Sequence, residues 1–232
     1  MSEEIEFELE ATAELDNYNG WIAETFSPYT GGSLLEIGAG IGTFSNLFAS
    51  KFEKITLIEP SSKLLNHLKE KFAAHKNFTV KQNSLDTEFL NSTNETFNSV
   101  LMVNVLEHIE DDAGALKILS NILLPGGYLL IFVPALQSLY SDFDRTVGHH
   151  RRYHRKNLAA IVESAGFEII KLRYFDWLGA TAWWFINVIF RSKKINPKSA
   201  KIYDRIGIPV TRAIENIITP PFGKNLILIA QK

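Results

Sequence analysis

A turn built from alternating glycines is the feature of this sequence with the clearest chemical use. Gly38, Gly40 and Gly42 follow the apolar segment 33–38. Glycines at these positions allow a tight turn, so that backbone N–H groups and the start of the next helix can approach a ligand. A second apolar segment ends in Glu59, where an open parallel sheet presents a carboxylate to a ribose diol. Together these residues predict a binding site for a cofactor that contains adenosine.

The spacing of the glycines separates two classes of cofactor. Dinucleotide-binding proteins use Gly-x-Gly-x-x-Gly, but this chain has Thr43 where the third glycine would stand. The spacing Glu-x-Gly-x-Gly-x-Gly, which begins at Glu36, resembles the first motif of class I S-adenosylmethionine-dependent methyltransferases. Two alternatives stay open. One is an NAD(P)-dependent oxidoreductase, which Thr43 disfavours, and the other is a non-catalytic protein that binds S-adenosylmethionine.

A second group of reactive side chains follows the fifth predicted strand. The segment 140–153 contains the pattern Asp-x-x-x-Gly-His-x-Arg-Arg-Tyr, which runs from Asp144 to Tyr153. Ligands of open α/β sheets bind at the carboxyl edge of the strands, so we expect this segment to stand over the site. Arginine binds carboxylate or phosphate bidentately. Two interpretations stay open: an acceptor site, or a structural network in which Asp144 pairs with an arginine.

Apolar segments alternate with helical patterns along the chain, as in a doubly wound α/β sheet. We expect seven strands in one Rossmann-like sheet, at 33–38, 54–59, 78–82, 99–104, 127–133, 167–174 and 225–230. Helices are expected at Asp16–Pro28, Gly42–Phe52, Ser61–Ala74, Asp111–Leu124 and Lys156–Ala165. Residues 1–232 are expected to form a single domain, with an N-terminal helical lid at 1–32 and a helical insertion at 175–222.

The resemblance to class I methyltransferases extends over most of the chain. The segment 100–112, which contains Leu106-Glu107-His108, resembles the fourth-strand motif, and 124–129 resembles the turn and fifth strand after it. The last strand resembles the antiparallel strand that marks this fold. The pattern from Asp144 to Tyr153 is similar to that of a bacterial subgroup of the superfamily. The resemblance therefore implies six parallel strands plus one antiparallel C-terminal strand, and S-adenosyl-L-methionine as cofactor.

The resemblance also implies which residues bind the cofactor. These are Tyr18, Glu36, Gly38, Ala39, Gly40, Gly42, Glu59, Pro60, Ser84, Leu85 and Asn104. Glu36 would orient the amino group, Glu59 would bind the ribose, and Tyr18 and Trp21 would cover the cofactor. The sequence departs from the family after the third strand, where Asn83 and Ser84 replace the common Gly-Asp and Asp86 is the next carboxylate.

Methyl transfer from a sulfonium depends chiefly on positioning, so the chemistry requires no metal. The protein can add a base for a proton of the acceptor. The candidate catalytic residues are His149, His108, Asp144, Arg152 and Tyr153. His108 has a second interpretation, in which it orders the loop after the fourth strand and contacts backbone.

Composition and charge narrow the class of partner. The chain is 46% apolar and 22% charged and has no cysteine, which fits one globular domain without disulfides or thiolate metal sites. The N-terminus lacks the pattern of a secretory signal, so we expect a cytoplasmic protein. No nucleic-acid-binding motif is present, and we expect a small-molecule acceptor instead.

An aromatic, nearly all-apolar segment at 177–190 is followed by the basic residues Arg191, Lys193 and Lys194. It is too short to span a bilayer, which takes ~20 residues. It can cap the acceptor pocket, or it can lie in a membrane interface as a weak peripheral contact through 177–194. Together with Arg145, Arg151 and Arg152, the basic cluster predicts an acceptor that is anionic or attached to an anionic lipid carrier.

Overall fold

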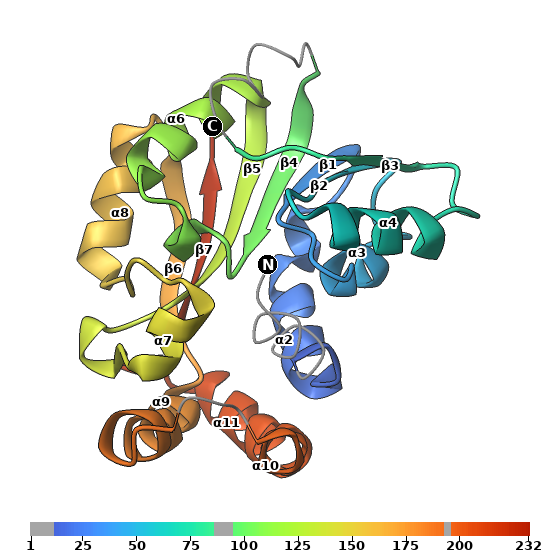
Figure 1. Cartoon of the computed structure of the whole chain (residues 1–232). Helices are drawn as coiled ribbons and strands as arrows, with labels where there is room; N and C mark the ends of the chain where they lie inside the picture. Colours follow the sequence, from blue (N-terminus) through green and yellow to red (C-terminus); the bar gives the residue numbers. More distant parts are fainter. Residues whose placement is uncertain (1–11, 86–94, 193–195) are drawn as a thin grey trace.

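A seven-stranded sheet forms the centre of the protein. The computed structural model describes residues 12–85, 95–192 and 196–232 (Figure 1). The strands are β1 (Ser33–Ile37), β2 (Lys54–Ile58), β3 (Phe78–Lys81), β4 (Phe97–Val103), β5 (Leu123–Pro134), β6 (Glu168–Phe175) and β7 (Asn225–Gln231), in the order β3-β2-β1-β4-β5-β7-β6. β7 runs antiparallel to both β5 and β6, and the other pairs are parallel. The predicted fold class is confirmed.

Helices cover both faces of this sheet because successive strand residues point to opposite sides. Leu35 faces a core completed by α6 (Asp112–Ile122) and α8 (Arg155–Ser164). Leu34 faces the other core, to which α2 (Asp16–Phe26), α3 (Thr43–Leu47) and α4 (Ser62–Lys71) contribute. Short 3-10 turns lie at η1 (Ser27–Tyr29), η2 (Leu106–His108) and η3 (Gln137–Leu139).

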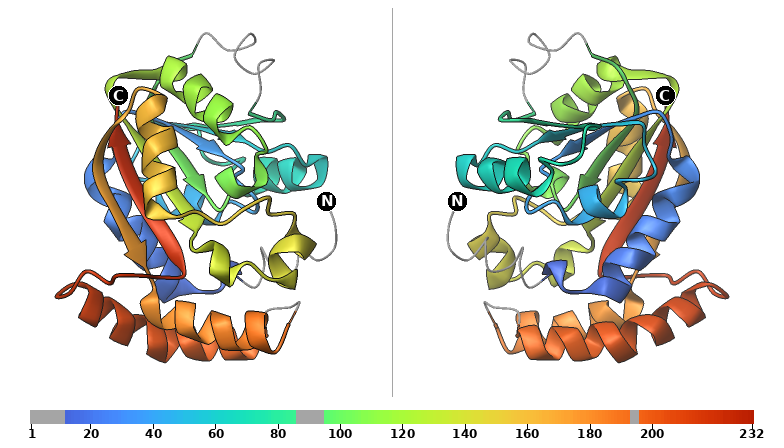
Figure 2. Two further views of the ribbon diagram at one scale, coloured as in Figure 1. Left: turned by 90° about the vertical axis from the view of Figure 1, so that its left-hand side faces the viewer. Right: turned by 90° about the vertical axis from the view of Figure 1, so that its right-hand side faces the viewer.

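The helical insert is the chain between β6 and β7, which forms two helical rods. The first joins α9 (Trp177–Trp183) to η4 (Trp184–Ile189), and the second joins α10 (Pro197–Ile202), η5 (Tyr203–Gly207) and α11 (Ile208–Glu215). Both rods lie in a layer beyond the carboxyl ends of the parallel strands (Figures 1 and 2). Among the described residues, no helix combines the length and apolar character that crossing a bilayer requires.

Two local predictions differ from the structure. The helix expected at Gly42–Phe52 ends at Leu47, because Ala49 and Lys51 bond to carbonyls three residues back and the chain tightens into turns. Within the segment expected to be a loop, α7 (Asp142–Val147) forms. Its start is a capping box in which Ser141 and Asp144 satisfy each other's backbone groups. This helix raises the residues after it above the sheet edge.

Candidate functional site

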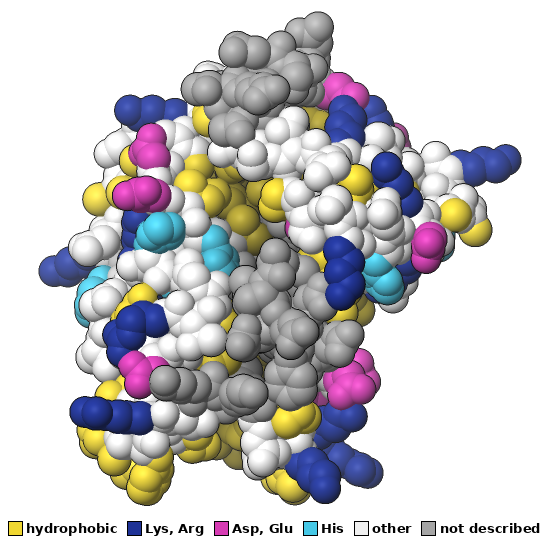
Figure 3. Space-filling view, viewed as in Figure 1, with side chains coloured by type: hydrophobic (Ala, Val, Ile, Leu, Met, Phe, Trp, Pro, Cys, Tyr) yellow, Lys and Arg dark blue, Asp and Glu magenta, His cyan; other side chains and the backbone are white. Residues whose placement is uncertain are grey.

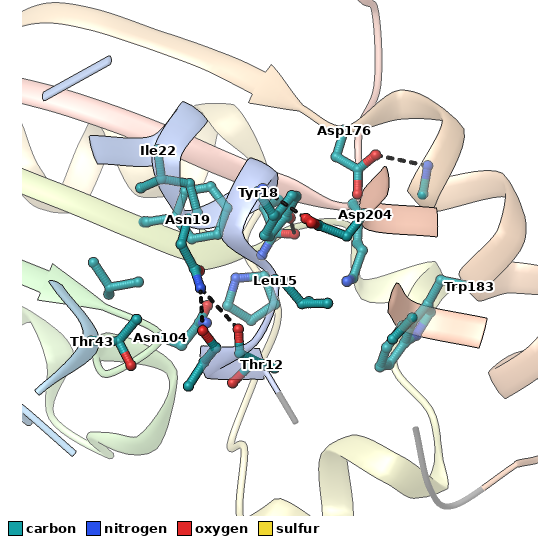
Figure 4. Close-up of a pocket in the computed structure, with 18 of the residues that line it drawn as sticks. Thr12, Leu15, Tyr18, Asn19, Ile22, Thr43, Asn104, Asp176, Trp183 and Asp204 are labelled. Carbon is teal, nitrogen blue, oxygen red and sulfur yellow. Dashed lines mark hydrogen bonds between the residues drawn. The ribbon is translucent and has the colours of Figure 1, made fainter. Parts of the chain in front are cut away.

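One cavity of about 520 Å³ lies between the carboxyl edge of the sheet and the helical insert. Its volume falls within the range of small-molecule sites. Thr43 and Asn104 line it from the sheet edge, whereas Asp176 and Trp183 line it from the insert side, as Figure 4 shows. Tyr18 of α2 borders the same space. The cavity is therefore continuous from the glycine turn to the insert.

The glycine turn has the conformation that its sequence predicts. Gly38, Gly40 and Gly42 have φ angles of 66°, 57° and 76°, values that side chains with a β-carbon rarely adopt. A Cβ on Gly38 would lie 2.7 Å from Val105, and one on Gly42 would lie 2.7 Å from the Phe72 ring. Glycine is thus required at both positions by conformation and by close packing.

Side chains from two other segments hold this turn in place. Lys71 of α4 donates hydrogen bonds to the carbonyls of Ile41 and Gly42 at 2.7 and 3.2 Å. Glu59 accepts the Gly40 N–H at 3.0 Å and the Ser61 N–H at 3.0 Å. The loop is therefore ordered around backbone groups that face the cavity, which is the arrangement that anion and nucleotide sites use.

Two buried carboxylates lie beside the turn. Burial raises the pKa of Glu36 to about 7, against the opposing hydrogen bond that Ser45 donates to Oε2 at 2.6 Å. Burial also raises the pKa of Glu59, and its bonds from Ser61 and Gly40 oppose that shift. Ser45 occupies one oxygen of Glu36, so this side chain keeps acceptor capacity for a cationic group in the cavity.

The predicted cofactor residues fall into two groups. Those that line the cavity are Tyr18, Glu36, Gly38, Ala39, Gly40 and Asn104. Those outside its lining are Gly42, Glu59, Pro60, Ser84 and Leu85. Trp21 is buried, and its ring lies 3.7 Å from that of Phe175, so the expectation that it covers the cofactor was wrong. Asp86 lies outside the described residues.

His149, Asp144 and Arg152 form a hydrogen-bonded chain at the cavity. Asp144 Oδ1 lies 2.9 Å from His149 Nδ1 and accepts the Arg152 Nε–H at 2.7 Å. Burial disfavours the ionised carboxyl, but the hydrogen bond to His149 and the ion pair with Arg152 lower the pKa of Asp144. An ionised Asp144 holds the Nδ1–H tautomer of His149, so the lone pair is on Nε2, which lies 3.8 Å from Glu107 Oε1.

His108 belongs to a neighbouring cluster with Glu107 and His149. The two imidazole rings lie 4.7 Å apart, edge to face. Desolvation at the cavity wall, together with nearby His149, lowers the pKa of His108 to about 4. One ligand atom from each of these three residues lies within 4.8 Å of the others, a spacing that can hold a metal ion. His108 is therefore neutral at physiological pH and is a weaker base than an unperturbed histidine.

Tyr153 does not fit the catalytic role expected from the sequence. Its hydroxyl lies 2.9 Å from Asp112 and 3.2 Å from the carbonyl of Leu106, and the side chain is buried away from the cavity. Arg151 also binds Asp112, at 2.7 Å. Side chains alternate along this extended segment, so Arg152 alone of these three neighbours faces the cavity.

The far end of the cavity contains residues that sequence reasoning missed. The Arg152 guanidinium lies 4.8 Å from the Trp183 ring centre, and the Lys224 ammonium lies 5.1 Å from it. Tyr18 donates a hydrogen bond to Asn225 at 2.9 Å. An antiparallel strand begins where its parallel neighbours end. The position of Lys224 and Asn225 just before and at the start of β7 is the signal that could have placed them here.

Comparison with known proteins identifies the family. A family model described as a methyltransferase domain matches residues 15–172, more than half of the chain. The chain belongs to this family, and its fold is that of class I methyltransferases. Among curated relatives, ubiquinone biosynthesis O-methyltransferase of Methylocella silvestris is 27% identical over 116 residues, which are 50% of this chain and 44% of that protein. The matched part spans less than half the length of the curated relatives it matches.

Solved structures share the fold over nearly the whole chain. A SAM dependent methyltransferase from Archaeoglobus fulgidus has a TM-score of 0.65 and 18% identity, with 97% of this chain and 98% of that chain covered. N-methyltransferase NodS from Bradyrhizobium japonicum, in complex with S-adenosyl-L-homocysteine, has a TM-score of 0.61 and 14% identity, with 99% of each chain covered. At these identities the likeness establishes a common fold.

Proposed function

We propose that this protein transfers a methyl group from S-adenosylmethionine to a small-molecule acceptor. The observation that carries the proposal is the single cavity, which has the glycine turn and Glu36 at one end and His149, Arg152 and Lys224 at the other. When bound, the cofactor would supply a methyl group activated by a sulfonium. A common chamber lets donor and acceptor be positioned for in-line displacement, which is the main source of acceleration in such a reaction.

The residues at the glycine end fit the cofactor that the family uses. Backbone of Gly38 to Gly40 would approach its methionine part, and Glu36 would accept hydrogen bonds from its ammonium group. Glu59 would bind the ribose, after exchanging one of its present bonds to the turn. Ser84 and Leu85 would flank the adenine, and Asn104, whose φ is 53°, would close the site near the sulfur.

The acceptor is anionic, either free or attached to a lipid carrier. Two cationic side chains, Arg152 and Lys224, lie on the Trp183 ring at the far end of the cavity. Arg152 uses Nε for Asp144 and Nη1 for the carbonyl of Ala135. A guanidinium has five N–H donors, so Arg152 retains donors for a carboxylate or phosphate. The pattern that contains Arg152 is also the one that resembles the bacterial subgroup, whose substrates are largely unassigned.

His149 is the candidate for proton removal from the acceptor. Its Nδ1 is held by Asp144, and its Nε2, which lies 3.8 Å from Glu107 Oε1, would take the proton. A base must lie within hydrogen-bond reach of the proton that it removes, and His149 lines the cavity. Arg152 and Asp144 then act as positioning residues. An acceptor that arrives as a neutral amine needs no such base.

Calorimetry with S-adenosylhomocysteine and with NADH tests the cofactor assignment. We expect binding heat with S-adenosylhomocysteine and none with NADH. The reverse result would contradict the cofactor assignment.

Acceptors are then screened in matched pairs of an acid and its neutral amide, with labelled S-adenosylmethionine. We expect transfer to the acid members, with a loss of ~10-fold or more in Lys224→Gln and Arg152→Ala. If both variants keep full activity on every acid, the acceptor is not anionic.

A further inference from the structure

The outer face of the helical insert concentrates the exposed apolar surface of the protein. Among the described residues, fourteen large apolar side chains are exposed, and twelve of them lie between β6 and β7. These twelve are Trp184, Phe185, Ile186, Ile189, Phe190, Ile202, Ile206, Val210, Ile214, Ile217, Ile218 and Phe222. Figure 3 shows apolar side chains along this edge of the molecule, with Lys and Arg beside them. Contiguous exposed apolar surface of this kind marks an interaction site.

The helix spacing places four of these side chains together. Ile202, Ile206, Val210 and Ile214 follow one another at four-residue intervals, which puts them on the same side of the second rod. Phe190 is 76% exposed and Ile217 is 85% exposed, values unusual for side chains of this size. We call these twelve residues, except Ile186, which lines the cavity, the outer face.

The inner side of the same rods packs apolar residues such as Trp183 and Ile208 and also holds bonded polar groups, so the outer face is not a result of loose packing. Asp204 accepts the Tyr18 N–H at 2.8 Å. Glu215 binds Arg173 at 3.0 Å and accepts the Trp177 N–H at 3.1 Å. A surface helix is usually apolar inside and polar outside, but these rods also turn apolar side chains outward. This is expected where the outer side meets an apolar phase.

Among the described residues of the insert itself, the exposed charges all have one sign, while Glu14 and Glu24 of the N-terminal segment pair with Lys201 and Arg212. Arg191, Lys198 and Arg205 are exposed, and Lys201 pairs with Glu14 at 2.7 Å on the lid side. The carboxylates in 175–222 are Asp176, Asp204 and Glu215, and all three are buried. Lys193 and Lys194 lie outside the described residues.

We infer that the outer face binds the surface of an anionic lipid bilayer. The helices lie along the interface, with Trp184, Phe185 and Phe190 at the level of the headgroups and acyl boundary. The exposed cations are attracted by anionic headgroups, at about fivefold in affinity for each residue near the surface. A second copy of this chain fits less well, because a two-fold interface would bring the same basic rim against itself.

This docking has a consequence that rests on the proposed function. Ile186 and Asn187 of the first rod, and Ser192 after it, line the cavity, so a bilayer beneath the rods lies next to the acceptor end of the chamber. An acceptor attached to a lipid could enter there without leaving the membrane. The docking itself does not depend on methyl transfer.

Vesicle flotation of the full chain tests the inference. The probes are vesicles of phosphatidylcholine alone and of phosphatidylcholine with phosphatidylglycerol, at low and high salt. We expect at least tenfold more flotation with the anionic vesicles, and its loss at high salt. Phe190→Asp and Ile217→Asp should each reduce flotation about tenfold, whereas Ile170→Asp, an exposed apolar position outside the insert, should not. Lys198→Glu with Arg205→Glu should also reduce it, whereas Lys51→Glu with Lys76→Glu should not.

Three outcomes would overturn the inference. The first is a wild-type protein that floats with neither vesicle. The second is flotation that is equal on both vesicles and unchanged by Lys198→Glu with Arg205→Glu. The third is a dimer, seen by light scattering, that Phe190→Asp dissociates while no vesicle binding occurs. S-adenosylhomocysteine binding, measured on the wild type and the same variants, separates these results from the proposed function. A wild type that does not bind S-adenosylhomocysteine contradicts the methyltransferase assignment but does not affect the docking result.

Discussion

Asp204 caps a helix that lies 186 residues away in the sequence: its Oδ1 accepts the backbone N–H of Tyr18 at 2.8 Å. Its other oxygen accepts two N–H groups of Asn17, each at 3.1 Å. The residue before α2, Leu15, offers no side-chain cap. A carboxylate on the insert therefore satisfies the start of the N-terminal helix, and it joins two segments that border the cavity.

Replacing Asp204 is expected to destabilise the fold. Asp204→Ala leaves partly buried N–H donors at a helix start without their charged acceptor, which costs about 1–2 kcal/mol of unfolding free energy. Chemical denaturation measures this loss. The matched control, Arg205→Ala, changes an exposed neighbour and should shift the free energy by less than about 0.5 kcal/mol. Equal stability of the two variants would show that the cap contributes nothing.

Cofactor binding is expected to depend on pH through Glu36. The pKa of this residue is raised to about 7, and an ammonium group binds its ionised form. The affinity for S-adenosylhomocysteine should therefore rise about tenfold between pH 6 and pH 8. Glu36→Gln should bind more weakly, with little change over this range. Titration calorimetry at several pH values checks this, and an equal slope in both proteins would exclude Glu36 as the titrating group.

The raised pKa of Glu36 also predicts that, without cofactor, the free energy of unfolding falls as pH rises, whereas cofactor affinity increases. Between the ordinary carboxyl pKa of 4.5 and about 7, folded Glu36 holds more protons than unfolded Glu36. The stability of the wild type relative to Glu36→Gln should therefore be greatest below the unfolded pKa and should fall as pH rises through about 7.

Glu59 is expected to contribute to cofactor affinity. Glu59→Ala removes charge-assisted hydrogen bonds to the ribose and should weaken S-adenosylhomocysteine binding by ~2–3 kcal/mol. Because Glu59 also holds Gly40 and Ser61, the melting temperature of the variant is measured alongside. Glu59→Gln should lose less affinity, and Glu53→Gln, on the exposed side of the same region, should lose none. Unchanged affinity in Glu59→Ala would contradict the ribose assignment.

His149 is expected to affect the rate of transfer rather than cofactor binding. His149→Ala should lower the methylation rate by ~100-fold or more on an acceptor that loses a proton, with nearly unchanged S-adenosylhomocysteine affinity. Asp144→Asn should also lower the rate, because an amide that presents its NH2 group to Nδ1 selects the other tautomer of His149. His108→Ala should have a smaller effect, since its pKa of about 4 makes it a poor base at neutral pH. Small, equal effects of both histidine variants would refute the base.

Treatment with a chelator distinguishes a role of His149 as a base from a metal site formed by Glu107, His108 and His149. The chemistry of a sulfonium requires no metal, so we expect the rate to survive treatment with EDTA. A loss that zinc or manganese restores would instead assign Glu107, His108 and His149 as ligands.

Local spacing was sufficient to predict the glycine turn and the carboxylates beside it. Glycines at 38, 40 and 42, with Glu36 before them and Glu59 after the next strand, are close in sequence to the elements that hold them. A strand, a turn and a helix start fix their geometry within a few residues. The positions of the strands could be predicted for the same reason, since alternation and apolar runs are local properties.

Tertiary structure decided which residues lie at the far end of the cavity. Lys224 and Asn225 reach the cavity because β7 runs antiparallel and begins at the edge where β4 and β5 end, and Trp183 reaches it through the packing of the insert. Within the segment that ends at Tyr153, the sequence offered three polar neighbours, and the direction of each side chain depended on a bridge between Ala135 and Tyr153. That pairing turned Arg152 toward the cavity and Arg151 and Tyr153 toward Asp112. Contacts between segments far apart in sequence have no local pattern, and they determined which reactive residues share a site.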